Sequence, residues 1–172
     1  LDQEARQRGT SVYLVDRVVP MLPPRLSNGI CSLNPDQDRL ALSALLTIGP
    51  DGETESGEII ETVIRSRART TYQEVREALE SQKAPDDRYP EFLDDLRLMR
   101  RLAERLEQRR IQRGSLEFEF PETVVELDPA GRPLTISPYP VSFANGLIEA
   151  FMIAANEYVA RQYYFLKLPF IY

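Results

Sequence analysis

The sequence predicts an α+β fold, in which antiparallel hairpins form a sheet and long helices pack against it. Pairs of β-rich segments flank turn sequences that contain glycine and proline, as expected of hairpins. These paired segments are residues 40–48 with 54–68 and residues 123–127 with 132–137. Apolar residues also recur at steps of three and four within residues 91–113 and 142–166, which predicts two long helices.

Both long helices have a predicted apolar face and a recognisable end. The first helix ends at Gly114, and Ser142 is a candidate N-cap for the second. The predicted core-facing residues of the first helix are Phe92, Leu96, Met99, Ala103 and Leu106. The predicted apolar face of the second consists of Leu147, Ile148, Phe151, Met152, Ala155 and Val159.

Shorter elements account for most of the remaining chain. Residues 1–8 predict a helix that Gly9 ends, and residues 71–80 predict another helix. Residues 11–15 form a brief β-type run, and alternation in residues 116–120 predicts a further strand. The remaining expectations are a turn at residues 27–29, a polar linker at residues 83–88 and a strand that begins at residues 169–172.

Composition limits the possible functions. Hydrophobic residues make up 42% of the chain and no apolar run is long enough to span a bilayer, so a membrane partner is not expected. The absence of histidine removes the commonest general base and metal ligand. A net charge of −6 is unusual for an isolated nucleic-acid binder. The single cysteine, Cys31, excludes an internal disulfide and fits a reducing, cytoplasmic location.

Charged clusters have both a functional and a surface interpretation. A one-sided row of Arg65, Arg67 and Arg69 could contact phosphates, but an exposed face or pairing with acidic residues is favoured. Asp86-Asp87 and Asp94-Asp95 are interpreted as surface residues rather than metal ligands. A solvated helix face is predicted for the arginines that are interleaved with Glu104 and Glu107. These arginines are Arg100, Arg101, Arg105, Arg109, Arg110 and Arg113.

Several motifs together resemble the catalytic domain (RNB domain) of the ribonuclease II/R family, and more closely its R branch. The most specific run extends from Thr10 to Pro35 and includes Val19-Pro20-Met21-Leu22-Pro23 and Leu26-Ser27-Asn28-Gly29. Further matches are Ile64 to Tyr72, Gly114 to Glu122 and Ala144 to Asn156. One departure is Gly146, which stands where relatives usually have arginine.

The resemblance implies a processive, metal-dependent exoribonuclease that degrades single-stranded RNA from the 3′ end to nucleoside 5′-monophosphates. The family's Mg²⁺-binding aspartate cluster has no match in these residues, so no catalytic or metal-ligating residue is assigned and the chain is expected to be an internal fragment that is inactive alone. The expected organisation is a truncated helix in residues 1–9, strands and a hairpin in 10–69, helices in 70–113, a strand and hairpin in 114–140 and a helix in 141–168.

The resemblance assigns RNA contacts to Tyr13, Phe118 and Glu149. Tyr13 and Phe118 match aromatic residues that clamp the last bases, and Glu149 matches a carboxylate that contacts a ribose. From the residues alone, core or rim packing is the default for Tyr13, and core packing is the default for Phe118. Glu149 shares a polar stripe with Asn145 and Asn156, which is usually a solvated face, although the apolar surroundings favour a buried, functional Glu149.

Other functions remain open at this stage. The same domain could be a catalytically inactive module that binds RNA or a protein, or a structural domain without an RNA role. The sequence carries no signal of the oligomeric state.

Overall fold

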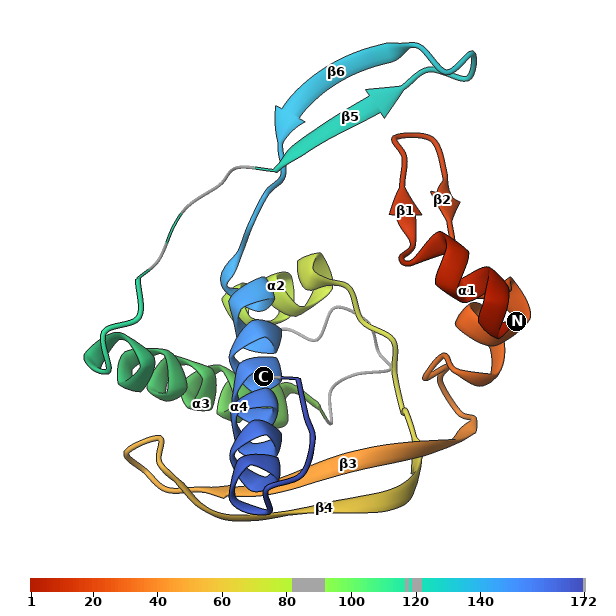
Figure 1. The fold of residues 1–172 in the computed structure, drawn as a ribbon. Helices are drawn as coiled ribbons and strands as arrows, with labels where there is room; N and C mark the ends of the chain where they lie inside the picture. Colours follow the sequence, from red (N-terminus) through yellow and green to blue (C-terminus); the bar gives the residue numbers. More distant parts are fainter. Residues whose placement is uncertain (82–91, 117, 119–121, 172) are drawn as a thin grey trace. The chain divides into compact units, whose positions relative to one another are not determined.

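The α+β class is confirmed: helices and two-stranded hairpins make up the structure (Figure 1). The computed structural model describes residues 1–81, 92–116, 118 and 122–171. In chain order, the elements are α1 (Asp2–Arg8), β1 (Val12–Tyr13), β2 (Val18–Val19), η1 (Arg25–Ile30), β3 (Asp38–Ile48), β4 (Thr54–Arg65), α2 (Tyr72–Ser81), α3 (Leu93–Gln112), β5 (Thr123–Leu127), β6 (Pro133–Pro138) and α4 (Phe143–Phe165).

The strands form separate hairpins instead of the single sheet that the sequence predicts. Among the described residues, β1 pairs with β2, β3 with β4, and β5 with β6, each as a two-stranded sheet. In the β5–β6 hairpin, the register places Val125 opposite Ile136, and an irregularity follows Glu126. Turn chemistry and alternation specify pairing within a hairpin, but neither specifies whether one hairpin adds to another.

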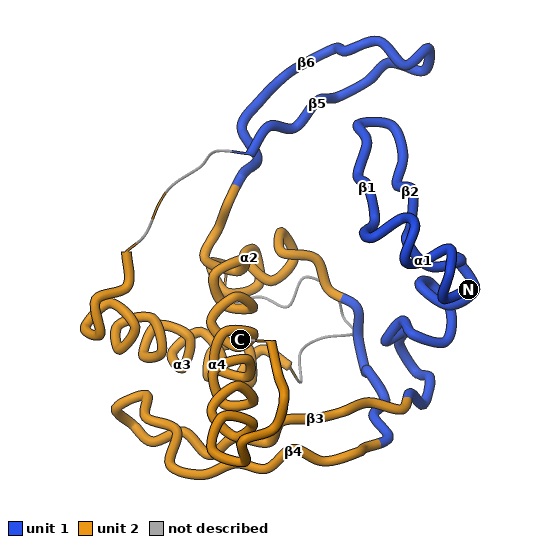
Figure 2. Tube along the Cα trace, viewed as in Figure 1, with its two compact units in different colours: residues 1–39, 63–69, 119–140 blue, residues 40–62, 70–118, 141–172 orange. Residues whose placement is uncertain are grey.

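The chain divides into two compact units, each built from segments that are distant in sequence (Figure 2). The first unit contains Leu1–Arg39, Val63–Arg69 and Glu119–Pro140. The second contains Leu40–Thr62, Thr70–Phe118 and Val141–Tyr172.

Helices α2, α3 and α4 pack against one another in the second unit. Small residues occupy the closest positions: Ala78 of α2, Ala103 of α3 and Ala144 of α4 are buried together with Leu147. Short side chains allow helix backbones to approach closely, so these alanines determine how near the three helices lie. The predicted core positions of α3 are confirmed, because all of them are buried or half-buried.

The apolar face predicted for α4 is only partly correct. Leu147 is buried, and Phe151, Ala155 and Val159 are half-buried, whereas Ile148 and Met152 are exposed. Tyr158, outside the predicted apolar face, is half-buried and reaches strand β4. The N-cap prediction is confirmed, since α4 begins after Ser142, whose N–H donates to Asn145 Oδ1 over 3.0 Å.

Helix α4 also lies directly on strand β4 at Gly57. The Tyr158 hydroxyl donates a hydrogen bond to the Gly57 carbonyl oxygen. A Cβ atom at position 57 would lie 2.7 Å from Leu46 Cδ2 and 2.8 Å from Tyr158 Cζ. No larger residue fits without displacing the helix or the strand.

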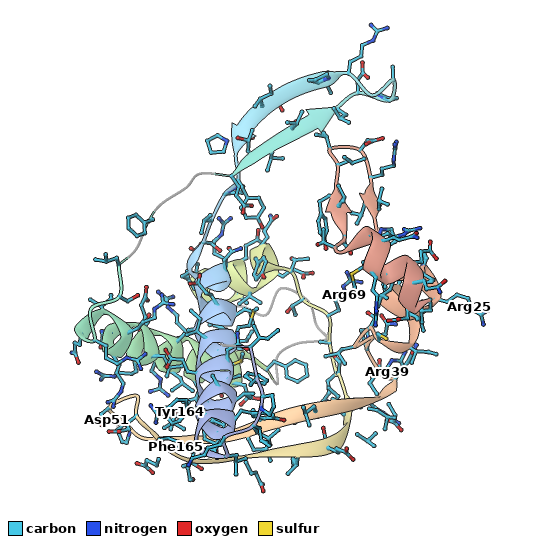
Figure 3. All side chains as sticks on the ribbon, viewed as in Figure 1. Arg25, Arg39, Asp51, Arg69, Tyr164 and Phe165 are labelled. Carbon is cyan, nitrogen blue, oxygen red and sulfur yellow. The ribbon has the colours of Figure 1, made fainter. Side chains whose placement is uncertain are left out.

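The first unit contains a compact turn of π-helix, η1, where the sequence predicts a simple turn at residues 27–29. Arg39 (Figure 3) holds this segment, because its guanidinium donates to the carbonyl oxygens of Ser32 over 2.8 Å and Gly29 over 3.4 Å. A wide turn held by an arginine from a later strand has no local sequence signature.

Several other expectations can be compared with the structure. Helix α1 ends at Gly9, which has a φ of 71°, as predicted. Residues 169–171 do not form the expected strand. The predicted linker at residues 83–88 lies outside the described residues. Among the described helices, none is both long and apolar enough to cross a bilayer.

We expect Gly57→Ala to destabilise the protein by about 1–3 kcal/mol, because the new methyl group would overlap Leu46 and Tyr158. The free energy of unfolding in urea measures the effect. Gly146→Ala is the matched control: it lies in α4, and a Cβ there meets no described atom within 4 Å. That change is expected to stabilise the helix by about 0.5–1 kcal/mol. Equal effects of the two variants would contradict the close contact at Gly57.

The ion pair between Asp38 and Arg65 makes stability depend on pH. Arg65 Nε donates to Asp38 Oδ1 over 2.7 Å, and this hydrogen bond, together with the arginine's charge, holds the pKa of Asp38 below its usual value. A lowered pKa contributes stability that is complete above the unfolded-state value of about 3.9 and is lost as pH falls through the folded-state value.

We therefore expect the wild type to be more stable than Asp38→Asn at neutral pH, with a small difference that disappears in acid. Urea unfolding of both proteins between neutral pH and about pH 2 provides the measurement. Because the pair is exposed, the difference should also shrink in high salt. A difference that persists unchanged in acid would exclude this role for the ion pair.

Candidate functional site

Tyr13 is the last residue of strand β1 and its side chain is exposed. It pairs with Val18 of β2, and Leu14 N–H donates to Arg17 O over 2.8 Å to close the hairpin turn. The residue is 79% exposed, so the default expectation that Tyr13 packs in a core is wrong. The two-residue strands bring no opposing layer over the ring within this hairpin, which leaves the aromatic face available for stacking.

Phe118 follows the end of helix α3 and is also exposed. The chain leaves α3 through Gly114, whose φ of 95° suits glycine, and Ser115 N–H donates to Arg110 O over 3.1 Å. Phe118 is 72% exposed, so core packing is wrong for this ring as well. Leu116 and Phe118 are not in a strand, and Phe120 lies outside the described residues.

The two rings belong to different compact units, because Tyr13 is in the first and Phe118 is in the second (Figure 2). Each unit thus supplies one of the two rings that the resemblance assigns to the base clamp. The convergence of the two rings on one stack of bases therefore stays a prediction.

Glu149 projects from helix α4 and is exposed, not buried. Its side chain is 62% exposed, and its Oε1 lies 3.3 Å from Arg110 Nη1 of helix α3. The expectation of a buried Glu149 is wrong, because the tightly packed side of α4 carries Ala144 and Leu147 and the carboxylate lies beside that contact. Asn145, from the same polar stripe, caps the helix instead of joining a site.

The C-terminal end of α3 also borders a cleft of about 150 Å³ within the second unit. Helix α4 and the β3–β4 turn complete its walls. Arg109 pairs with Glu53 over 3.2 Å, and Arg113 pairs with Glu157 over 2.9 Å. These pairs compensate the charges of Arg109 and Arg113, and a further arginine, Arg161, also lines the cleft.

The predicted solvated arginine face is partly correct, because Arg101, Arg105 and Arg113 are exposed and the other three arginines of the set are half-buried. Arg100 pairs with Glu104 along the helix, as a surface residue would, although its guanidinium also lies 4.2 Å from the centre of the Phe143 ring. Arg109, Arg110 and Arg113 instead reach other elements of the unit. Their partners lie 39 to 58 residues away in sequence, so the interleaved glutamates on α3 gave no signal of them.

No group of three or more acidic, cysteine or histidine residues that could hold a metal occurs in the described part of the chain. Asp94 pairs with Arg97 over 2.8 Å, and Asp38 pairs with Arg65, in agreement with the surface interpretation of these charges. Asp86 and Asp87 lie outside the described residues. The side chains at Tyr13, Phe118 and Glu149 can supply stacking, hydrogen bonding and ion pairing.

Comparison with known proteins places these features in a family. Residues 1–172 match the model of the RNB domain. Ribonuclease R of Thermotoga maritima is 45% identical over 100% of this chain and 24% of its own length. Ribonuclease R 1 of Lactococcus lactis is 41% identical over 100% of this chain and 21% of its own length.

A solved structure is similar to the chain in three dimensions. It is Mycoplasma genitalium RNase R in complex with ribose-methylated single-stranded RNA, which is 30% identical and gives a TM-score of 0.88 over 96% of this chain and 26% of that chain. The chain thus spans about a quarter of the length of the proteins it matches.

Proposed function

The chain belongs to the RNB-domain family, and from this premise we propose that it is part of a processive 3′-to-5′ exoribonuclease. The substrate of the whole protein is single-stranded RNA, and the products are nucleoside 5′-monophosphates. Within that enzyme, this segment holds the terminal nucleotides while metal-dependent hydrolysis takes place on residues outside it. The exposure of Tyr13 and Phe118, at positions where core packing is the default, is the observation that carries the proposal.

The aromatic rings bind RNA by stacking. Every base has an aromatic face, so stacking holds a strand without reading its sequence, as an enzyme that degrades RNA of any sequence requires. In this role, Tyr13 and Phe118 each stack on one of the last bases. Stacking also suits an acidic chain, because it does not depend on neutralising phosphates.

The Glu149 carboxylate contributes the contact that is specific for RNA. A carboxylate oxygen accepts a hydrogen bond from a ribose 2′-hydroxyl, which DNA lacks. The exposure of Glu149 at the side of α4 makes the carboxylate accessible to a strand.

Mg²⁺ is the metal we propose for the whole enzyme, since a bound divalent ion would activate water and stabilise charge on the phosphoryl oxygens. No group of three or more possible metal ligands occurs among the described residues, and we propose that the aspartates that bind the ion lie outside this chain.

We expect Tyr13→Ala and Phe118→Ala to weaken binding of a single-stranded oligoribonucleotide by about tenfold each, because each change removes one stacked base contact. Fluorescence anisotropy on the whole protein, with the metal chelated, measures the dissociation constant. Phe165→Ala is the control, since Phe165 (Figure 3) has the same 72% exposure as Phe118 but lies at the end of α4. A loss for Phe165→Ala that equals the other two would show that exposed aromatic residues bind RNA without a defined site.

We also expect the 172-residue chain alone to release no nucleoside monophosphates from a single-stranded oligoribonucleotide with Mg²⁺, while the whole protein does. Thin-layer chromatography of the labelled products distinguishes the two. Robust release of nucleoside monophosphates by the chain alone would contradict the proposal that the catalytic residues lie outside it. RNA binding without release by the whole protein would instead identify a catalytically inactive RNA-binding module.

A further inference from the structure

The end of helix α3 connects three arginines to acidic residues on other elements. Arg109 pairs with Glu53 in the turn between β3 and β4. Arg110 pairs with Glu149 of helix α4, and Arg113 pairs with Glu157 of the same helix. Two of these pairs therefore have the same design, an arginine of α3 that reaches a glutamate of α4. Only one of the two glutamates, Glu149, matches a position with a proposed RNA contact.

The Arg110–Glu149 pair is asymmetric in its exposure to solvent. The Arg110 side chain is 21% exposed, whereas the Glu149 side chain is 62% exposed. The guanidinium is thus held within the α3–α4 packing, and the carboxylate is presented outward. The Arg113–Glu157 pair lacks this asymmetry, because its side chains are 48% and 49% exposed.

The geometry of the pair leaves part of the carboxylate for a ligand. Arg110 Nη1 lies 3.3 Å from Glu149 Oε1, and an ionised carboxylate has a second oxygen and several acceptor sites. Fixing one oxygen restricts the rotamers of a long side chain before RNA arrives, which removes part of the entropic cost of binding. The arginine charge also offsets the repulsion between the carboxylate and RNA phosphates.

We propose that Arg110 is a positioning residue that orients Glu149 toward the ribose 2′-hydroxyl. The proposal rests on the ribose contact of Glu149 in the proposed function. Arg110 acts through Glu149 and not on the RNA itself. Its loss therefore reduces the preference for ribose over deoxyribose, while the protein stays folded.

The test uses the whole enzyme and two substrates: an all-ribose oligonucleotide and the same oligonucleotide with 2′-deoxyribose near its 3′ end. The readout is the ratio of kcat/KM values for the two substrates, and thermal unfolding of each variant reports on folding. Glu149→Gln and Arg110→Gln are each expected to lower the ratio by about tenfold. Arg113→Gln, which breaks the matched pair with Glu157, should leave the ratio unchanged.

Two further variants separate positioning from general damage. Arg110→Lys keeps the positive charge but not the planar guanidinium, so the ratio of kcat/KM values should fall less than in Arg110→Gln. This variant also replaces Arg110→Gln in the test if the latter protein does not fold. The double variant Arg110→Gln/Glu149→Gln should be no worse than Glu149→Gln alone, because both changes disrupt one contact.

The outcomes distinguish the two proposals. If Glu149→Gln leaves the ratio unchanged, the ribose contact itself is wrong and the role of Arg110 is wrong with it. If Glu149→Gln lowers the ratio but neither Arg110→Gln nor Arg110→Lys does, only the positioning role is overturned. Equal losses for Arg110→Gln and Arg113→Gln would also overturn it, because they would assign the effect to helix packing.

Discussion

The close packing of helix α4 against helix α3 and strand β4 is the constraint on which the second unit depends. Ala103 and Ala144 are buried among the three helices, and Gly57 gives Tyr158 access to the backbone of β4. At Gly57, a side chain would have to displace Leu46, Tyr158 or the neighbouring strand backbone. Because α4 is fixed on two sides, the residues on its remaining surface, Glu149 among them, project in a defined direction.

Ion pairs at the end of α3 give this unit its electrostatic character. Arg109, Arg110 and Arg113 each meet an acidic partner, so the charges of these three arginines are largely compensated. Together with a net charge of −6, this argues against a binding mode based mainly on phosphate neutralisation by this segment. The exposed rings of Tyr13 and Phe118 and the paired carboxylate of Glu149 instead favour recognition of bases and ribose.

Local patterns predicted the secondary structure well. The three- and four-residue spacing of Phe92, Leu96 and Met99 identified α3, and turn chemistry identified the hairpins β3–β4 and β5–β6 to within a few residues. Such features depend on neighbours in the sequence, so they can be deduced without a structure. The sequence predicted only a plain turn within the segment that forms η1. Arg39, which stabilises η1, lies in a different element and gives no local signal.

The candidate site could be predicted only in part. The family resemblance located Tyr13, Phe118 and Glu149, but hydrophobicity alone assigned both rings to a core, and the helical stripe could not show which side of α4 packs on α3. Arg110 was assigned to a solvated face because its partner is 39 residues away. Exposure and long-range pairing are tertiary properties, and a single sequence does not encode them in any local pattern.

Photo-crosslinking of the whole protein to a single-stranded RNA with a photoreactive thiouridine at its 3′ end tests the central claim most directly. With the metal chelated to keep the RNA intact, mass spectrometry of the crosslinked peptides identifies the residues that touch the last base. The account predicts crosslinks at Tyr13 and Phe118. Crosslinks at the exposed aromatic residues at the end of α4, Tyr164 and Phe165 (Figure 3), with none at Tyr13 or Phe118, would contradict it.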